Sequence, residues 1–213
     1  MANFNKGILG AFSGKVGNVV GASWRSLNIL RSLPRKSNKQ ATVGQISQRQ
    51  KFGLITSFIM LGKVVVEQYF GNRHAYKSRL NLCVSYHLKE AVLGTVDNFT
   101  IDYTKVIWTK GELLGLNNVT ITPAVGLLLD LTFAGMSGQS NALATDEVLL
   151  VLYCPSFGEL PVYYNIAERD DGAASVMVSS IWLGEQVHAW IAVTDNQRKL
   201  VATSQYLGVV TIL

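Results

Sequence analysis

The spacing of apolar residues changes twice along the chain, and each change marks a predicted boundary. Up to residue 41, large apolar residues recur among glycines and polar residues, with Val19–Trp24 and Ile29–Leu33 as candidate strands of a hairpin. The next segment follows helical spacing, and from Thr95 onward apolar and polar residues alternate. The pattern therefore predicts an N-terminal arm or hairpin over 1–41, a helical hairpin over 42–94 and a β-sandwich over 95–213.

The central segment carries helix signals at both ends. Thr42 and Gln45 have the spacing of a capping box, and Gly71 is a typical helix stop. These signals and the apolar stripe between them predict one helix over 43–69. A second apolar stripe predicts a helix over 78–92, which would pair with the first in an antiparallel hairpin.

The C-terminal half reads as a series of short strands separated by turn signals. The candidate strands are Val119–Thr122, Leu127–Phe133, Val148–Tyr153, Val162–Ile166, Ser175–Ser179, Gln186–Val193 and Val201–Ile212. This number and spacing predict an immunoglobulin-like sandwich, and so an α+β fold that is mainly β. The strand phase places Leu127, Leu129, Leu131, Val187 and Ile191 in its core.

The basic residues are concentrated in the first third of the chain, which indicates an anionic partner. Apolar residues make up 48% of the chain and charged residues 15%, against about 25% in an ordinary globular domain. Residues 1–66 hold ten Lys or Arg and no acid, whereas residues 67–213 hold nine basic and fourteen acidic residues. Such asymmetry points to nucleic acid, an anionic surface or the acidic face of a neighbouring copy. The basic patch that would contact phosphates consists of Arg25, Arg31, Arg35, Lys36, Lys39, Arg49 and Lys51.

Catalytic, metal and cofactor signatures are missing from the sequence. The run from Gly10 to Lys15 lacks the first glycine of a phosphate-binding loop, and no nucleophile elbow is present. Asp146-Glu147 and Asp170-Asp171 are interpreted as solvated strand ends and turn formers. We therefore expect no enzyme activity, no cofactor and no metal.

Targeting signals are also missing. No signal peptide precedes a cleavage site, and the longest uncharged stretch near the helices, residues 52–62, is short of the about twenty residues that span a membrane. We expect synthesis in the cytoplasm, with Cys83 and Cys154 as free, buried thiols.

Three aromatic residues are candidates for a binding surface. Trp182 falls at a turn, Trp190 is on the outward phase of its strand, and Tyr163 is one of two adjacent tyrosines. Exposed, they could bind a glycan or a partner protein. The alternative is that the helical pair covers them.

The sequence carries two resemblances. The segment 174–193, with Gly184 at a turn and Val187, Ala189, Ile191 and Val193 in phase, resembles the E–F half of a fibronectin type III domain, although that family's turn proline and following tyrosine are missing. The run Gly14–Val20 with Trp24, Arg31–Pro34, Thr42, Gln45, Arg49 and Phe52 resembles an uncharacterised Bacteroidota family over nearly the whole chain. That family implies a glycine-rich hairpin, a helical pair and a sandwich, and no active site. A weaker likeness points to phage and prophage structural proteins.

The leading hypothesis is a structural subunit of a virion, prophage particle or filament. Its arm would dock on a neighbouring copy through Val19, Trp24, Ile29 and Leu33, which predicts a homo-oligomer. Docking within the same chain would bury the same residues, but the charge split favours a neighbouring copy. The alternatives are a glycan- or protein-binding module and a sequence-independent nucleic-acid binder.

Overall fold

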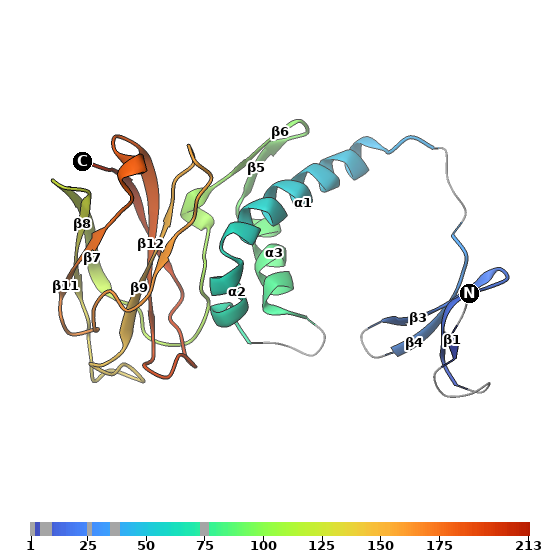
Figure 1. The fold of residues 1–213 in the computed structure, drawn as a ribbon, viewed down its shortest axis with the longest axis horizontal. Coiled ribbons are helices and arrows are strands. Elements are labelled where there is room, and N and C mark those ends of the chain that lie inside the picture. Colours follow the sequence, from blue (N-terminus) through green and yellow to red (C-terminus); the bar gives the residue numbers. More distant parts are fainter. Residues whose placement is uncertain (1–2, 5–9, 25–26, 35–38, 73–76) are drawn as a thin grey trace. The chain divides into compact units, whose positions relative to one another are not determined.

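A computed structural model describes the chain except for residues 1–2, 5–9, 25–26, 35–38 and 73–76. It divides into two compact units, Met1–Thr42 and Val43–Leu213, which are described separately below (Figure 1).

The N-terminal unit is a four-stranded antiparallel sheet in the order β1-β2-β3-β4. Its strands are β1 (Asn3–Phe4), β2 (Phe12–Val16), β3 (Val19–Trp24) and β4 (Leu27–Ser32). Gly17, with a φ of 56°, makes the tight turn between β2 and β3, a conformation that glycine adopts without strain. The expected hairpin is present as β3 and β4, and β1 and β2 extend it into a sheet.

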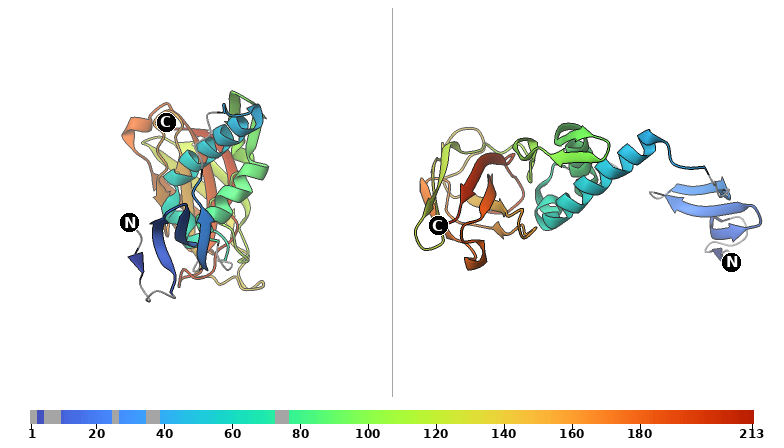
Figure 2. Two further views of the ribbon diagram at one scale, coloured as in Figure 1. Left: turned by 90° about the vertical axis from the view of Figure 1, so that its right-hand side faces the viewer. Right: turned by 90° about the horizontal axis from the view of Figure 1, so that it is seen from above.

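The second unit contains a sandwich of two antiparallel sheets (Figures 1 and 2). One sheet has the order β11-β8-β7, with β7 (Asn117–Ala124), β8 (Leu128–Ala134) and β11 (Ala173–Met177). The other has the order β10-β9-β12-β13, with β9 (Glu147–Tyr153), β10 (Val162–Tyr163), β12 (Gln186–Thr194) and β13 (Gln205–Thr211). Three strands facing four in this order is the fibronectin type III arrangement, so the predicted fold class is confirmed.

The predicted strand phase of the sandwich is correct at most positions. Leu129, Leu131, Val187 and Ile191 are buried between the two sheets. Leu127 is only half-buried, because it lies in the turn before β8 with a φ of 64° and packs at the rim of this core.

Three helices form a third layer on the outer face of the β9–β12 sheet (Figure 2). They are α1 (Val43–Leu61), α2 (Lys63–Tyr69) and α3 (Arg79–Glu90), and the hairpin of β5 (Val92–Thr95) and β6 (Asn98–Ile101) follows them. Short 3₁₀ turns occur at Tyr103–Lys105 and Ser180–Trp182.

The expected single helix over 43–69 is wrong, because the chain bends by 85° between α1 and α2. Gly62 lies at the bend, where any larger side chain would collide with the ring of Trp108. Helical spacing continues across the bend, which is why periodicity missed it. No single helix of the described residues has the length and apolarity to cross a membrane.

The helical layer and the sandwich share a second hydrophobic cluster. Ile55, Ile59 and Val66 from the helices pack against Val151 and Trp190 from the sheet, and all five side chains are buried. The predicted division between 94 and 95 cuts through this cluster, so residues on both sides of it belong to one compact unit.

Candidate functional site

The N-terminal sheet exposes apolar side chains on both faces. Residues opposite one another in the register share a face, and the face alternates along each strand. One face, which we call the tryptophan face, carries Val20, Ala22, Trp24, Leu27 and Ile29. The other, the phenylalanine face, carries Phe12, Val16, Val19 and Leu30. Trp24 and Leu27 are 54% exposed and Leu30 is 66% exposed, so the described residues of the N-terminal unit cover neither face.

The structure places the predicted docking residues in this sheet but not on a single face. Trp24 and Ile29 lie on the tryptophan face, and Val19 lies on the phenylalanine face. Leu33 follows β4, and its amide donates to the carbonyl of Asn18 at 2.8 Å. A single docking face made of all four residues is therefore excluded, and two separate apolar faces take its place.

The predicted basic patch is divided between the two units. Arg31 lies on β4 and is exposed. It pairs with Val20 of β3, which in turn pairs with Lys15 of β2. Arg49 and Lys51 lie on α1 of the second unit, where the ammonium of Lys51 is 5.0 Å from the centre of the Phe99 ring. Lys39 is exposed near the end of the first unit, and Arg25, Arg35 and Lys36 lie outside the described residues.

The expected surface aromatics are not on the surface. Trp182 is 1% exposed, because it closes one end of the sandwich core, and its Nε1 donates to Glu159 at 3.2 Å. Trp190 is fully buried under the helical layer and donates to the carbonyl of Val106 at 2.9 Å. Tyr163 is half-buried against the sandwich core. The alternative that a second layer covers the outward phase of β12 is correct for Trp190.

The side chains of Cys83 and His87 lie next to each other in the helical layer, and both are buried. His87 Nδ1 lies 2.8 Å from the carbonyl of Cys83, and its Nε2 accepts from the amide of Ile107 at 3.2 Å. These partners fix a neutral imidazole with the proton on Nδ1. Burial lowers the pKa of His87 to about 4 and raises the pKa of the Cys83 thiol, so the imidazole is neutral and the thiol is protonated near neutral pH. Cys83 and Cys154 are free and buried, as expected.

An ion pair that sequence reasoning missed holds the loops at one end of the sandwich. The side chains of Arg169 and Asp146 are 0% and 1% exposed and meet at 3.0 Å. The guanidinium also donates to three backbone carbonyls, those of Leu114, Gly115 and Gly135, at 2.7 to 3.1 Å. The expectation that Asp146 is a solvated strand end is therefore wrong. Asp170 and Asp171 are exposed beside a turn, as expected.

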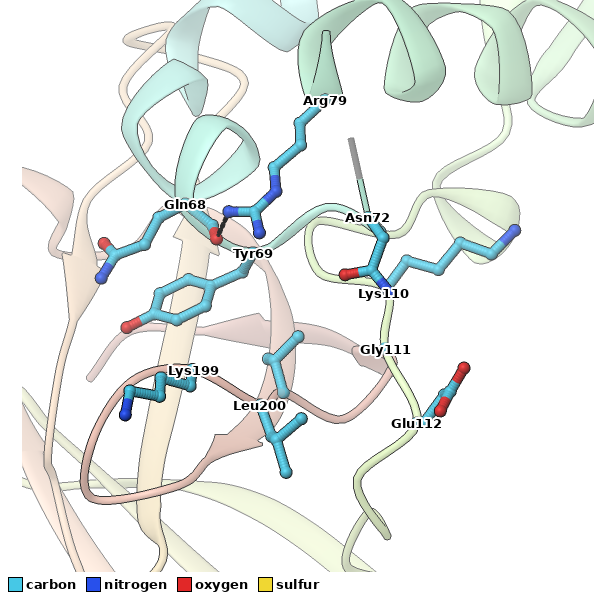
Figure 3. A pocket seen from close by; sticks show the side chains of 11 residues that line it. Gln68, Tyr69, Asn72, Arg79, Lys110, Gly111, Glu112, Lys199 and Leu200 are labelled. Atoms are coloured by element: carbon cyan, nitrogen blue, oxygen red, sulfur yellow. Dashed lines mark hydrogen bonds between the residues drawn. The ribbon is translucent and has the colours of Figure 1, made fainter. Parts of the chain in front are cut away.

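A cavity with a volume of about 220 Å³ lies between the helices and the sandwich (Figure 3). Three cations line it, but they do not converge on one point. The Arg79 guanidinium donates to the carbonyls of Gln68 and Glu67, and the ammonium of Lys110 lies 5.3 Å from the centre of the Tyr86 ring. Lys110 and Lys199 point in different directions in Figure 3. Among the described residues that line it, the cavity therefore lacks the convergent donors of an anion site.

In the part of the chain that the structure describes, no group of three or more His, Cys, Asp or Glu side chains is placed to hold a metal ion. The most unusual feature of this chain is the exposed N-terminal sheet. Strands β2 to β4 of that sheet fall within a recognised family: residues 11–208 match the model of a family of unknown function, DUF6266. The chain belongs to this family. Because the DUF6266 match begins before β2 and reaches into β13, β2 to β4 are part of what the family shares.

Other comparisons add little to this assignment. No curated protein matches the chain in sequence. Among solved structures, the chain is similar to the FN1–FN3 domains of chicken CNTN1, with a TM-score of 0.38 and 10% identity. The similarity covers 47% of this chain and 34% of the other, so the chain spans about a third of that structure.

Proposed function

We propose that this DUF6266 protein is a non-enzymatic structural subunit whose N-terminal unit docks on a neighbouring copy. The observation that carries the proposal is the single-layer sheet with apolar side chains on both faces, among them Trp24, Leu27 and Leu30. An apolar sheet face must be buried against another element, and exposed apolar patches of this kind mark interaction sites. A subunit of a virion, prophage particle or filament is the class that fits such a docking element.

Charge supports a second copy as the partner. Residues 1–42 contain seven Lys or Arg and none of the acidic residues of the chain, so residues 43–213 carry a net charge of −2. Opposite charge on the two units favours contact between one unit and the other, and disfavours contact between two N-terminal units.

Deletion of residues 1–41 tests the proposal, because the second unit has its own hydrophobic core and can fold without them. Analytical ultracentrifugation of the full-length protein should show concentration-dependent oligomers, and the truncated protein should be a folded monomer. A full-length protein that stays monomeric at high concentration, or a truncated protein that assembles equally well, contradicts the proposal. Nucleic acid that copurifies with the full-length protein and dissociates with salt would favour the nucleic-acid binder instead.

A further inference from the structure

The edges of the sandwich are protected to different degrees. Exposed strand edges invite pairing with another chain, and proteins block them with proline, bulges, charge or short strands. β10 has two residues, β7 contains Pro123, and β13 is bulged beside Gly208, which has a φ of 105°. β11 is five residues long with the sequence AASVM, and has no proline, no charge and no bulge.

The backbone bonds show which groups of β11 are unpaired. Phe133 N donates to Gly172 O and Val178 N donates to Leu127 O, both at 2.9 Å, so positions 172 and 178 face β8. Because orientation alternates along a strand, 174 and 176 also face β8. The amides and carbonyls of Ala173, Ser175 and Met177 therefore point to the open side, where no strand pairs among the described residues.

The N-terminal sheet has an equivalent open edge. β1 has two residues, whereas β4 has six and pairs only with β3 in the described chain. Leu33 N donates to Asn18 O, so odd-numbered positions of β4 face β3. Asn28, Leu30 and Ser32 then direct their amides and carbonyls outward.

Charge matches these two edges to each other. Glu168, Asp170 and Asp171 are exposed immediately before β11, and Asp130 accepts a 2.5 Å hydrogen bond from Ser175 on the adjacent strand. β4 carries Arg31 and lies in a unit without any acid. Pairing of β4 with another β4 would instead bring two units of the same charge together.

We propose that β4 of one copy adds to the edge of β11 in the next copy, extending the β11-β8-β7 sheet by one strand. This inference rests on the proposed function and names the acceptor for its docking unit. Main-chain hydrogen bonds from three outward positions on each strand supply the affinity. The contact is heterologous, so each copy offers one donor edge and one acceptor edge and assembly can continue.

Proline substitutions in the full-length protein test the two edges separately. Ser175→Pro removes an outward amide of β11, and its control Ser175→Ala removes the side-chain bond to Asp130 but keeps the amide. Leu30→Pro does the same on β4, with Leu30→Ala as its control. Each proline variant should weaken association about tenfold or more relative to its alanine control, because several main-chain bonds are lost.

Mixing the two proline variants distinguishes this pairing from others. The Leu30→Pro protein keeps an intact β11, and the Ser175→Pro protein keeps an intact β4, so an equimolar mixture should form dimers that neither forms alone. If Ser175→Pro assembles as well as Ser175→Ala while deletion of residues 1–41 abolishes assembly, β11 is not the acceptor and the proposed function stands. A full-length protein that is monomeric contradicts both.

Disulfide trapping decides the question if a proline variant fails to fold. Single variants Leu30→Cys and Ser175→Cys, mixed under oxidation, should yield a cross-linked heterodimer. Leu30→Cys mixed with Thr122→Cys, beside the proline-blocked edge of β7, is the matched control and should yield little. Equal yields from the two mixtures overturn the pairing of β4 with β11.

Discussion

Arg169 Nε donates a 3.0 Å hydrogen bond to Asp146 Oδ2 where neither side chain reaches water. The backbone amide of Arg169 also donates to the carbonyl of Asp146 at 2.8 Å, so the two residues are joined by both side chain and main chain. A buried ion pair adds little net stability compared with a pair of apolar side chains at the same positions. Removal of one partner, however, leaves the other buried with an uncompensated charge.

Asp146→Asn should therefore lower the free energy of unfolding by about 3–5 kcal/mol, because it leaves the Arg169 guanidinium buried without its counter-charge. Urea denaturation measures the change. Asp170→Asn is the matched control: that carboxylate is exposed, and its loss should change stability by less than about 0.5 kcal/mol. Equal effects of the two substitutions would show that Asp146 does not hold the charge of Arg169.

His87 makes stability depend on pH. Its pKa falls from 6.5 to about 4 in the folded state because burial disfavours the charged imidazole, so the unfolded chain binds the proton more tightly. Its contribution is complete above pH 6.5 and is lost as pH falls through that value toward 4, by about 3 kcal/mol in all. His87→Gln should flatten this part of the curve of unfolding free energy against pH. A slope that the substitution leaves unchanged would assign the effect to other groups.

Two glycines of the helical layer should respond to alanine with opposite signs. Gly62→Ala should destabilise the protein by about 1–3 kcal/mol, because the new methyl group collides with Trp108. Gly53, inside α1, has open space around it, so Gly53→Ala should stabilise by about 0.5–1 kcal/mol through helix propensity. Thermal unfolding of both variants measures the difference, and destabilisation by both would mean that α1 is not a regular helix at Gly53.

Ile191 is a test of the sandwich core. Ile191→Ala should cost about 2–5 kcal/mol, since the side chain is 2% exposed between the two sheets. Val209→Ala on β13 removes a side chain that is 48% exposed and should cost far less. Guanidinium denaturation of both variants compares the two positions, and a loss below about 0.5 kcal/mol at Ile191 would place that side chain outside the core.

The spacing of apolar residues predicted most of the fold, because it shows which face of each helix or strand is buried. It placed Val187 and Ile191 correctly on β12, and it separated the N-terminal segment from the helices. It failed at Gly62, where the chain bends by 85° close to the ring of Trp108 although apolar residues continue at helical spacing. It also failed at Asp146, whose partner Arg169 lies 23 residues away in a loop with no regular spacing.

The N-terminal sheet was predicted only in outline. Glycines and apolar residues indicated a hairpin that needs a partner, and alternation along β3 alone places Val19 and Trp24 on opposite faces. Which of these two faces Phe12 and Val16 of β2 share depends on strand register. Register follows from the turn at Gly17, which alternation alone does not locate. The open edge of β11 likewise becomes visible only when the strand order is known.

Because Trp190 is buried beneath the helices, the sandwich depends on them and cannot be separated from them. Fibronectin-type modules commonly occur in tandem, because the outer faces of both sheets of the sandwich can be exposed to solvent. Here the outward residues of β9 and β12, among them Leu149 and Val151, are as fully buried as the residues between the two sheets. A sandwich without its helices would expose an apolar sheet face to water and aggregate. Recombination can therefore transfer residues 43–213 only as a single unit.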